Sequence, residues 1–227
     1  MEAVLDVEAL RANLRTDSRE KNAMRPLRME KESTYRADGS ATIFQGNTVV
    51  VASIYGPKRC STTNVEFSDE ANISVQISYT NEKEDSALMD MEYSIQRLLE
   101  NVIKRSLFPR TTINVYIQVI CDDGSLFAVI LNSVMLALDD SEIPINNKFA
   151  ALCLLLSDNG EILPDPCKAE EDGSNSGIAT IVLNESGEVL SFRTFGGVTD
   201  ETLQNITVVG RNLAKRVFYL INHKLLA

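Results

Sequence analysis

The chain has 227 residues, of which 44% are hydrophobic and 24% charged, proportions typical of a soluble globular protein with a sizeable core. No apolar run approaches the roughly 18 residues of a membrane span, so we expect no membrane segment. The formal net charge is −10. This charge argues against a free-standing nucleic-acid binder, so RNA contact would need a local basic patch or partner proteins.

The cysteines and the single histidine exclude two classes of site. The four cysteines (Cys60, Cys121, Cys153 and Cys167) show no C-x-x-C spacing, which favours reduced thiols in a cytosolic or nuclear protein. Because His223 is the only histidine, we expect neither Ser-His-Asp or Cys-His catalysis nor a histidine-based zinc site.

Apolar periodicity and turn residues predict a mixed order of strands and helices. In chain order we expect a short helix at 7–14 with an extended lead-in, a hairpin of strands 41–44 and 48–54 around Gly46-Asn47, a stop at Gly56-Pro57, a strand at 73–79, a helix at 85–107, a strand at 111–120, a helix at 126–138, a strand at 149–156, a turn at 159–160, a polar loop at 164–177, strands at 178–183 and 188–193, and a helix from 199 or 200. This order predicts an α+β fold of mixed sheets covered by helices, in a single domain spanning 1–227.

The stretch Cys121-Asp122-Asp123-Gly124-Ser125 joins the strand at 111–120 to the helix at 126–138. That helix is apolar on nearly every face, which predicts burial. Gly124 permits a tight turn, and the first free N–H groups with the Ser125 hydroxyl predict an anion site. A phosphate-binding enzyme would want a cation beside it, but the next residue is Leu126. Asp122-Asp123 is open to two interpretations, a metal-binding pair or, more often, a solvated turn that favours the helix N-terminus.

Three segments together resemble the RNase PH family over roughly residues 25–200. They are Gly39-Ser40-Ala41-Thr42-Ile43-Phe44-Gln45-Gly46-Asn47-Thr48-Val49-Val50-Val51 through Gly56-Pro57; Ser94-Ile95-Gln96-Arg97; and Pro109-Arg110-Thr111-Thr112-Ile113 with Asp123-Gly124-Ser125, Asn132, Ala137-Leu138 and Ile143-Pro144. Each motif alone is weak, and their order and spacing make the match specific. The resemblance implies an RNase PH-like fold (ribosomal protein S5 domain 2-like). It also implies that active members shorten RNA from its 3′ end by phosphorolysis.

The resemblance places three apolar residues at family positions that need charge. The family's phosphate-clamping arginine falls on Met91, its second phosphate arginine on Leu126, and its catalytic aspartate is best aligned to Ile178. Gly124 and Ser125 look like the remnant of the phosphate site. We therefore predict that the chain is phosphorolytically inactive and has no catalytic residue or cofactor. Restoring Met91→Arg, Leu126→Arg and Ile178→Asp together should recover phosphate binding.

Other polar residues leave alternatives open. Lys58 and Arg59 are candidates for RNA contact or plain solvated residues, and Arg97 either contacts RNA or pairs with an acid or a neighbouring subunit. Asp165 and Asp172 are weak metal candidates in a loop whose acids are more often only solvated. Asn132 is expected to be a hydrogen-bonded core or interface residue.

Within the family, the resemblance implies a non-catalytic subunit of the RNA exosome ring that supports 3′-to-5′ RNA processing and degradation, including that of rRNA. The implied partners are other ring subunits, cap proteins and RNA, with a possible homodimer when the chain is isolated. The implied location is the nucleus (nucleolus) and the cytoplasm. The competing hypothesis is a weak metal- or phosphate-dependent nuclease acting on RNA or DNA.

Overall fold

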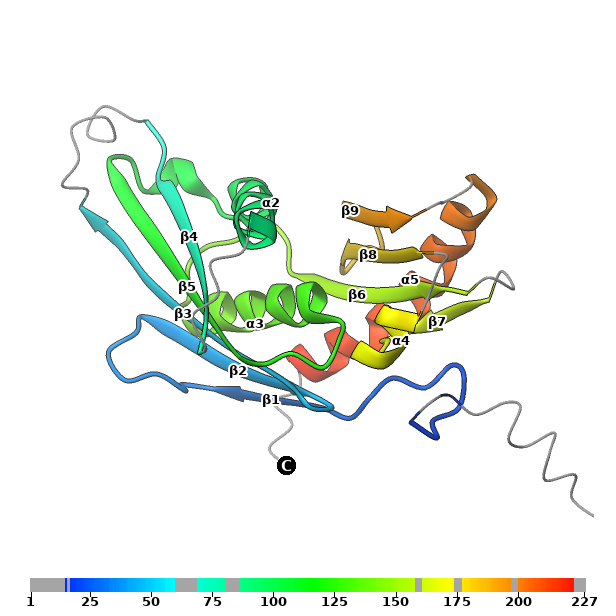
Figure 1. Ribbon diagram of the computed structural model, residues 1–227. Helices are drawn as coiled ribbons and strands as arrows, with labels where there is room; N and C mark the ends of the chain where they lie inside the picture. The colour runs from blue at the N-terminus through cyan, green and yellow to red at the C-terminus, as the bar shows by residue number, and fades with distance from the viewer. Residues whose placement is uncertain are drawn as a thin grey trace, which may run out of the picture.

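The computed structural model describes residues 15, 17–59, 69–80, 86–157, 161–173, 177–196 and 200–222. These residues form two sheets with helices between and beside them, so the α+β class predicted from the sequence is confirmed (Figure 1). The predicted helix at 7–14 and the predicted turn at 159–160 lie outside the described residues.

The first sheet has five strands in the order β1-β2-β3-β5-β4, and only the β4–β5 pair is parallel. The strands are β1 (Leu27–Lys31), β2 (Gly39–Gln45), β3 (Thr48–Arg59), β5 (Thr111–Cys121) and β4 (Asn72–Tyr79). The predicted hairpin is confirmed, because Gln45 pairs with Thr48 across the Gly46-Asn47 turn. Gly46 has a φ of 58°, which a tight two-residue turn requires and glycine adopts readily.

The second sheet has four antiparallel strands in the order β7-β6-β8-β9. They are β7 (Ile162–Pro164), β6 (Phe149–Leu156), β8 (Gly177–Asn184) and β9 (Val189–Gly196). Helix α3 (Leu126–Asp140) lies between the sheets and packs on β2 and β3 on one side and on β6 on the other (Figure 1). This position explains why its sequence is apolar all round.

Two amphipathic helices complete the core. Helix α2 (Ser86–Val102) packs its stripe around Ile95 and Leu99 toward β4, and α5 (Asp200–Asn222) packs its stripe around Ile206 and Val217 on β6 and β8. Both stripes follow the three- and four-residue spacing read in the sequence. None of the helices in the described ranges is both long and apolar enough to cross a membrane.

Side-chain hydrogen bonds pin α3 to the edge of β6. Asn132, 2% exposed, donates from Nδ2 to the Ala151 carbonyl at 2.9 Å and accepts from the Ala151 N–H at 2.8 Å. Asn132 thereby satisfies both backbone groups of one strand residue. The expectation of a hydrogen-bonded core residue is confirmed.

The prediction that Gly56-Pro57 ends the second hairpin strand is wrong. β3 continues to Arg59, with a register shift between the Tyr55–Asn114 and Lys58–Thr112 pairs, and the Gly56–Pro57 peptide is cis. The shift leaves Gly56 and Pro57 outside the ladder, so the missing N–H of proline breaks no ladder bond.

The prediction of one helix over 85–107 is also wrong at its C-terminal end. α2 ends at Val102, Ile103 forms an isolated bridge with Ile145, and Lys104 donates its N–H to the Pro144 carbonyl at 3.0 Å. A separate 3₁₀ turn, Arg105–Leu107, follows. The contact with residues 144–145 diverts the backbone where the local pattern would continue the helix.

Three short elements were not predicted. β1 forms in the segment read as an extended lead-in, and β7 precedes the segment read as a polar loop at 164–177. That loop instead contains helix α4 (Lys168–Gly173). Each of these elements has six residues or fewer and is supported by contacts with distant strands or loops. Local periodicity therefore carries little information about them.

Candidate functional site

The candidate site is the loop that joins β5 to the buried helix α3. Gly124 has a φ of 92° and Ser125 a φ of 55°, both in the left-handed region. A Cβ on Gly124 would lie 2.6 Å from the carbonyl oxygen of Pro166. Only glycine lets the backbone of residues 166–168 come this close to the loop. In the same contact, the Lys168 N–H donates to the Asp123 carbonyl at 3.1 Å. The segment before α4 therefore packs directly on Gly124 and Ser125, which form the N-terminal entrance of α3, called the mouth of α3 below.

A buried arginine supports this loop from behind. The Arg25 guanidinium donates to the carbonyl oxygens of Asp123 at 2.6 Å and Gly124 at 3.0 Å. The same guanidinium forms a bidentate salt bridge with Asp165, in which Nε donates to Oδ2 at 3.0 Å and Nη2 donates to Oδ1 at 2.7 Å. Arg25 is 5% exposed and Asp165 1%. One side chain thus joins the N-terminal lead-in, the mouth of α3 and the turn before α4.

The charge on Asp165 is maintained by its partner. Burial by itself would raise the pKa of this carboxyl, but the hydrogen bonds and positive charge of Arg25 outweigh burial and hold the pKa below its ordinary value. The backbone N–H of Arg25 adds a third bond to Oδ2 at 2.7 Å. Both carboxylate oxygens are therefore occupied by arginine donors.

The mouth of α3 is occupied by the chain's own carboxylate. The Ser125 N–H donates to Oε1 of Glu171 at 2.7 Å, and the Ser125 hydroxyl donates to the Pro166 carbonyl at 2.9 Å. Burial raises the pKa of Glu171, although the Ser125 N–H bond and the charge of Lys168 favour its ionised form. Both polar groups of Ser125 that were expected to meet phosphate are engaged within the chain, as a helix N-terminus engages an anion.

The sequence that builds this loop matches a known family. The model of the 3′ exoribonuclease family, domain 1 (RNase PH), matches residues 23–144, which is more than half of the chain and includes Arg25, Gly124 and Ser125. The chain belongs to the RNase PH family. The predicted resemblance and the predicted RNase PH-like fold are confirmed.

Relatives within the family are exosome proteins of the Rrp46 and Rrp41 types. The chain is 34% identical to the exosome complex exonuclease RRP46 homolog of Arabidopsis thaliana over 157 residues, which cover 69% of this chain and 65% of that protein. It is 27% identical to the exosome complex component Rrp41 of Thermoplasma volcanium over 222 residues, 94% of this chain and 89% of that protein. The crystal structure of rice (Oryza sativa) Rrp46 superposes with a TM-score of 0.86 at 27% identity, covering 93% of this chain and all of that one. The sequence itself favours the Rrp46 type (ribosomal-RNA-processing protein forty-six), and this resemblance is confirmed.

The three RNase PH positions expected to lack charge lie on three different elements. Leu126, at the start of α3, is 8% exposed and part of the core, while Met91 on α2 and Ile178 on β8 are half-buried and pack against that core. Met91 and Leu126 are therefore packing residues. Their equivalence to the family's arginines, and that of Ile178 to its aspartate, stays a prediction.

The candidate RNA-contacting cations lie on separate elements. Lys58 and Arg59 are exposed at the end of β3, and Lys58 lies 3.7 Å from Asp38. Arg97, on α2, donates to the Tyr93 hydroxyl at 2.9 Å and pairs with Glu100 at 3.4 Å. Of the partners considered for Arg97, Glu100 is the acid it contacts. The RNA-binding role of all three stays a prediction.

The candidate metal ligands have different environments. Asp165 is buried on Arg25, whereas Asp172 is exposed in α4. Asp122 lies 3.5 Å from Lys168, and Asp123 accepts from Asn47 at 3.0 Å. Within the described ranges, no group of three or more His, Cys, Asp or Glu side chains is arranged to hold a metal. The assignment of Gly124 and Ser125 as the remnant of a phosphate site stays a prediction.

Sequence reasoning missed Arg25 and Glu171 as members of the site. Arg25 lies in the charged lead-in, and its partner Asp165 is 140 positions away, so spacing carries no signal for their pairing. Glu171 carried a weak signal, because Pro166 followed by acids is typical of the first turn of a short helix. Its bond to Ser125 spans 46 positions and depends on the close packing at Gly124.

Proposed function

We propose that this chain is a non-catalytic RNase PH-type subunit of an RNA exosome ring. It supports 3′-to-5′ RNA processing and degradation, including that of rRNA, by holding the ring and contacting the RNA path while a separate nuclease cuts. The names of the Arabidopsis and Thermoplasma relatives, an exosome exonuclease homolog and an exosome component, support the assembly. The lack of catalysis follows from residues of this chain at the mouth of α3 and at the three family positions.

The observation that carries the proposal is the carboxylate of Glu171 at the mouth of α3. An anion already accepts the Ser125 N–H at 2.7 Å, so inorganic phosphate would have to displace it. Two missing arginines, at Met91 and Leu126, remove charge-assisted hydrogen bonds worth about 1.5–3 kcal/mol each. A missing general acid at Ile178 lowers the rate by about another 10²–10⁴. These losses act on one step, so phosphorolysis is not supported.

The first test is a nuclease assay on 3′-labelled RNA and DNA, with and without phosphate and with and without Mg²⁺. We expect no phosphate-dependent shortening of either substrate by the full chain. Robust Mg²⁺-dependent cleavage that Asp172→Asn abolishes would instead support the hydrolytic nuclease hypothesis and overturn the proposal.

The second test restores the phosphate site and measures phosphate binding by calorimetry. The triple variant Met91→Arg, Leu126→Arg, Ile178→Asp is expected from the sequence alone to recover phosphate binding. Because Glu171 accepts the Ser125 N–H at the mouth, we now expect this variant to gain little affinity. Adding Glu171→Gln, which removes the competing charge, should give measurable binding. The matched control is Glu161→Gln, which replaces an exposed acid directly before β7 and should add nothing to the phosphate affinity.

Circular dichroism must accompany this test, because Leu126 is buried and an arginine there can unfold the chain. A folded quadruple variant that binds no phosphate would contradict the assignment of these positions. Equal gains from Glu171→Gln and Glu161→Gln would contradict the role of Glu171.

The proposed partners are other RNase PH-type ring subunits, cap proteins and RNA, with a homodimer when the chain is isolated. The proposed location is the nucleus, including the nucleolus, and the cytoplasm, and we further propose that residues 1–227 form one RNase PH-like domain. Affinity purification followed by mass spectrometry tests the assembly. Recovery of the chain without any ring protein would count against it.

A further inference from the structure

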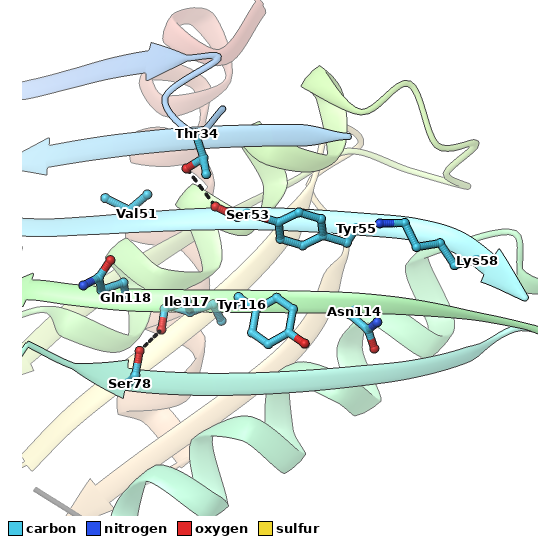
Figure 2. Close-up of a pocket in the computed structure, with 10 residues that line it drawn as sticks. All are labelled: Thr34, Val51, Ser53, Tyr55, Lys58, Ser78, Asn114, Tyr116, Ile117 and Gln118. Atoms are coloured by element: carbon cyan, nitrogen blue, oxygen red, sulfur yellow. Dashed lines mark hydrogen bonds between the residues drawn. The ribbon is translucent and has the colours of Figure 1, made fainter. Parts of the chain in front are cut away.

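The outer face of the five-stranded sheet has no assigned role. α3 covers the inner face, and on the opposite face of β3, β5 and β4 lies an open hollow of about 590 Å³ (Figure 2). Its lining includes the amides of Asn114 and Gln118 on β5 (Figure 2). The Ser53 and Ser78 hydroxyls of the lining are already bonded within the chain, to the Thr34 hydroxyl at 2.9 Å and to the Ile117 carbonyl at 3.4 Å. The hollow is therefore a mixed surface in which the two amides are the polar groups offered to a ligand.

The outward strand positions of this face carry no acidic residue, and the one carboxylate paired with its lysine is that of Asp38, 3.7 Å from the Lys58 ammonium among the described residues. The outward positions alternate along the strands, at 49–55 in β3, 112–120 in β5 and 72–78 in β4. They hold only Val, Ser, Thr, Tyr, Asn, Gln and Ile, in a chain with 32 acidic residues and a net charge of −10. A polyanion can therefore approach this face without meeting a carboxylate from these positions.

Two aromatic rings lie on adjacent central strands of this face. Tyr55 on β3 and Tyr116 on β5 contact each other edge to face, with ring centroids 5.7 Å apart and an interplanar angle of 74° (Figure 2). Tyr116 is 46% exposed, so one ring is available to a ligand. Aromatic side chains on adjacent central strands of an open sheet are the arrangement on which nucleobases stack in sheet-based RNA-binding modules.

The register shift in β3 brings a cation to the same face. Strict alternation after Tyr55 would turn Lys58 inward, but the shift pairs Lys58 with Thr112, which shares a face with Asn114. The Lys58 ammonium lies 4.9 Å from the centroid of the Tyr55 ring. Beside it, the buried Thr112 hydroxyl has no hydrogen-bond partner among the described residues.

The composition of the face fits bases better than a protein partner. A protein interface of standard size buries about 800 Å² on each side around a core that is about 65% apolar. Half of the residues that line the hollow are Ser, Thr, Asn or Gln, and the rest are two tyrosines, one lysine, Val51 and Ile117. Amide side chains hydrogen-bond base edges, and a tyrosine face stacks on any base.

We propose that this sheet face binds a short stretch of single-stranded RNA, with a base stacked on Tyr116, base edges hydrogen-bonded by Asn114 and Gln118, and one phosphate near Lys58. The proposal rests on the proposed function only for the choice of RNA over DNA. The lining of the hollow includes none of Gly124, Ser125 and Glu171, so the site is separate from the mouth of α3.

The experiment measures the anisotropy of fluorescein-labelled single-stranded RNA 8-mers titrated with the full chain at several salt concentrations. Tyr116→Ala should weaken binding roughly tenfold or more, because stacking on one ring is lost. Tyr116→Phe keeps the aromatic face and should bind within about twofold of the unmodified chain. Lys58→Gln should reduce the slope of log K against log salt by about 0.7, as expected for one phosphate on a single strand.

The matched control is Tyr219→Ala, which removes a tyrosine of similar exposure, 55%, from helix α5. It should leave binding unchanged. Equal weakening by Tyr116→Ala and Tyr219→Ala, or no effect of Tyr116→Ala in a folded protein, would overturn the proposal. Loss of a co-purifying ring protein with unchanged RNA binding would show a protein interface instead and also overturn it.

These outcomes are separate from those that test the proposed function. A chain that joins a ring but binds RNA equally with and without Tyr116 would refute only the sheet-face site. A chain that binds RNA through Tyr116 but purifies without ring proteins would refute only the assembly. Single-stranded DNA 8-mers in parallel titrations test the choice of RNA, and tighter DNA binding would overturn that choice.

Discussion

Arg25 and Asp165 are a buried ion pair with every near group arranged to favour the charges. The guanidinium has further acceptors in the Asp123 and Gly124 carbonyls, and the carboxylate has a further donor in the Arg25 N–H. Placing two charges in the interior costs free energy, and such a pair tolerates the loss of one partner poorly. The pair therefore matters most for holding the loop at the mouth of α3 in position.

At the residue scale, Asp165→Asn should lower the free energy of unfolding by about 3–5 kcal/mol, because the buried Arg25 charge loses its directly bonded counter-ion and keeps the partly exposed Asp123 carboxylate at 3.8 Å. Urea unfolding followed by circular dichroism measures this change. Glu161→Gln is the control, because its pair with Lys21 is exposed and such pairs contribute about 0–1 kcal/mol. Similar losses in both variants would contradict the role given to Asp165.

The same ion pair predicts how the free energy of unfolding changes at low pH. Since the pKa of Asp165 is lower in the folded chain than its ordinary value of about 3.9, its carboxylate stabilises the fold above that value. This stability should be lost as the pH falls below about 4 and through the folded pKa. In urea titrations between pH 6 and pH 3, the decline should be shallower for Asp165→Asn, and parallel curves would argue against this linkage.

At the scale of elements, the mouth of α3 depends on how closely two backbone segments approach. Gly124 lets Pro166 and Cys167 pack against the loop, and this packing brings Glu171 of α4 to the Ser125 N–H. α4 has only six residues and would not be stable as an isolated helix. Its position is therefore set by the loop it contacts rather than by its own sequence.

Gly124→Ala should lower the free energy of unfolding by about 2–4 kcal/mol, because the new methyl group meets backbone atoms at 2.6 Å and the φ of 92° disfavours alanine. Gly173→Ala, at the end of α4, is the matched control, since its Cβ would meet nothing within 4 Å. That variant should be neutral or slightly stabilising. Thermal unfolding of both variants decides the matter, and a neutral Gly124→Ala would refute the close-packing argument.

At the scale of the whole molecule, the N-terminal lead-in holds together parts of the chain that are far apart in sequence. Arg15 donates to the Glu170 carboxylate at 2.8 Å from Nε and to the Pro164 carbonyl at 2.5 Å, across about 150 positions. Its side chain is 2% exposed and that of Glu170 7%. The second sheet thus gains contacts from a segment that precedes the first strand of the first sheet.

Arg15→Ala should destabilise the chain by about 3–5 kcal/mol, because Glu170 is left buried without its main partner. It should also speed proteolytic cleavage within residues 161–173, which lose their attachment. Arg28→Ala is the control, as the Arg28–Glu30 pair is largely exposed, 63% and 42%. Limited proteolysis with mass spectrometry distinguishes the two variants, and equal cleavage rates would contradict the anchoring role.

Long periodic elements could be predicted from the sequence, whereas short ones could not. The stripe of α2 around Ile95 and Leu99 and the all-apolar surface of α3 identify both helices and their buried faces. β1 and α4 have no comparable pattern. The end of α2 was misplaced because the contact with residues 144–145 overrides a local pattern that is still helical.

For the candidate site too, local features could be predicted from the sequence and long-range contacts could not. Gly124 and Ser125 were identified because a glycine turn before a buried helix is a local signature of an anion site. The sequence also predicts that Met91 and Leu126 replace family cations, and this equivalence stays a prediction. Three features could not be predicted from the sequence. They are the contact of Glu171 with the site, the support of the site by Arg25, and the place of Lys58 beside Tyr55 and Tyr116 on one sheet face.

The sequence by itself therefore determined the family, the α+β class and the buried helix, because these depend on residue identity and short-range spacing. Only the tertiary structure decided what occupies the mouth of α3 and which polar side chains share the outer sheet face. Those features depend on a contact across 46 positions and on a one-residue register shift in β3. Neither leaves a periodic trace in the sequence, since each is set by how distant segments pack.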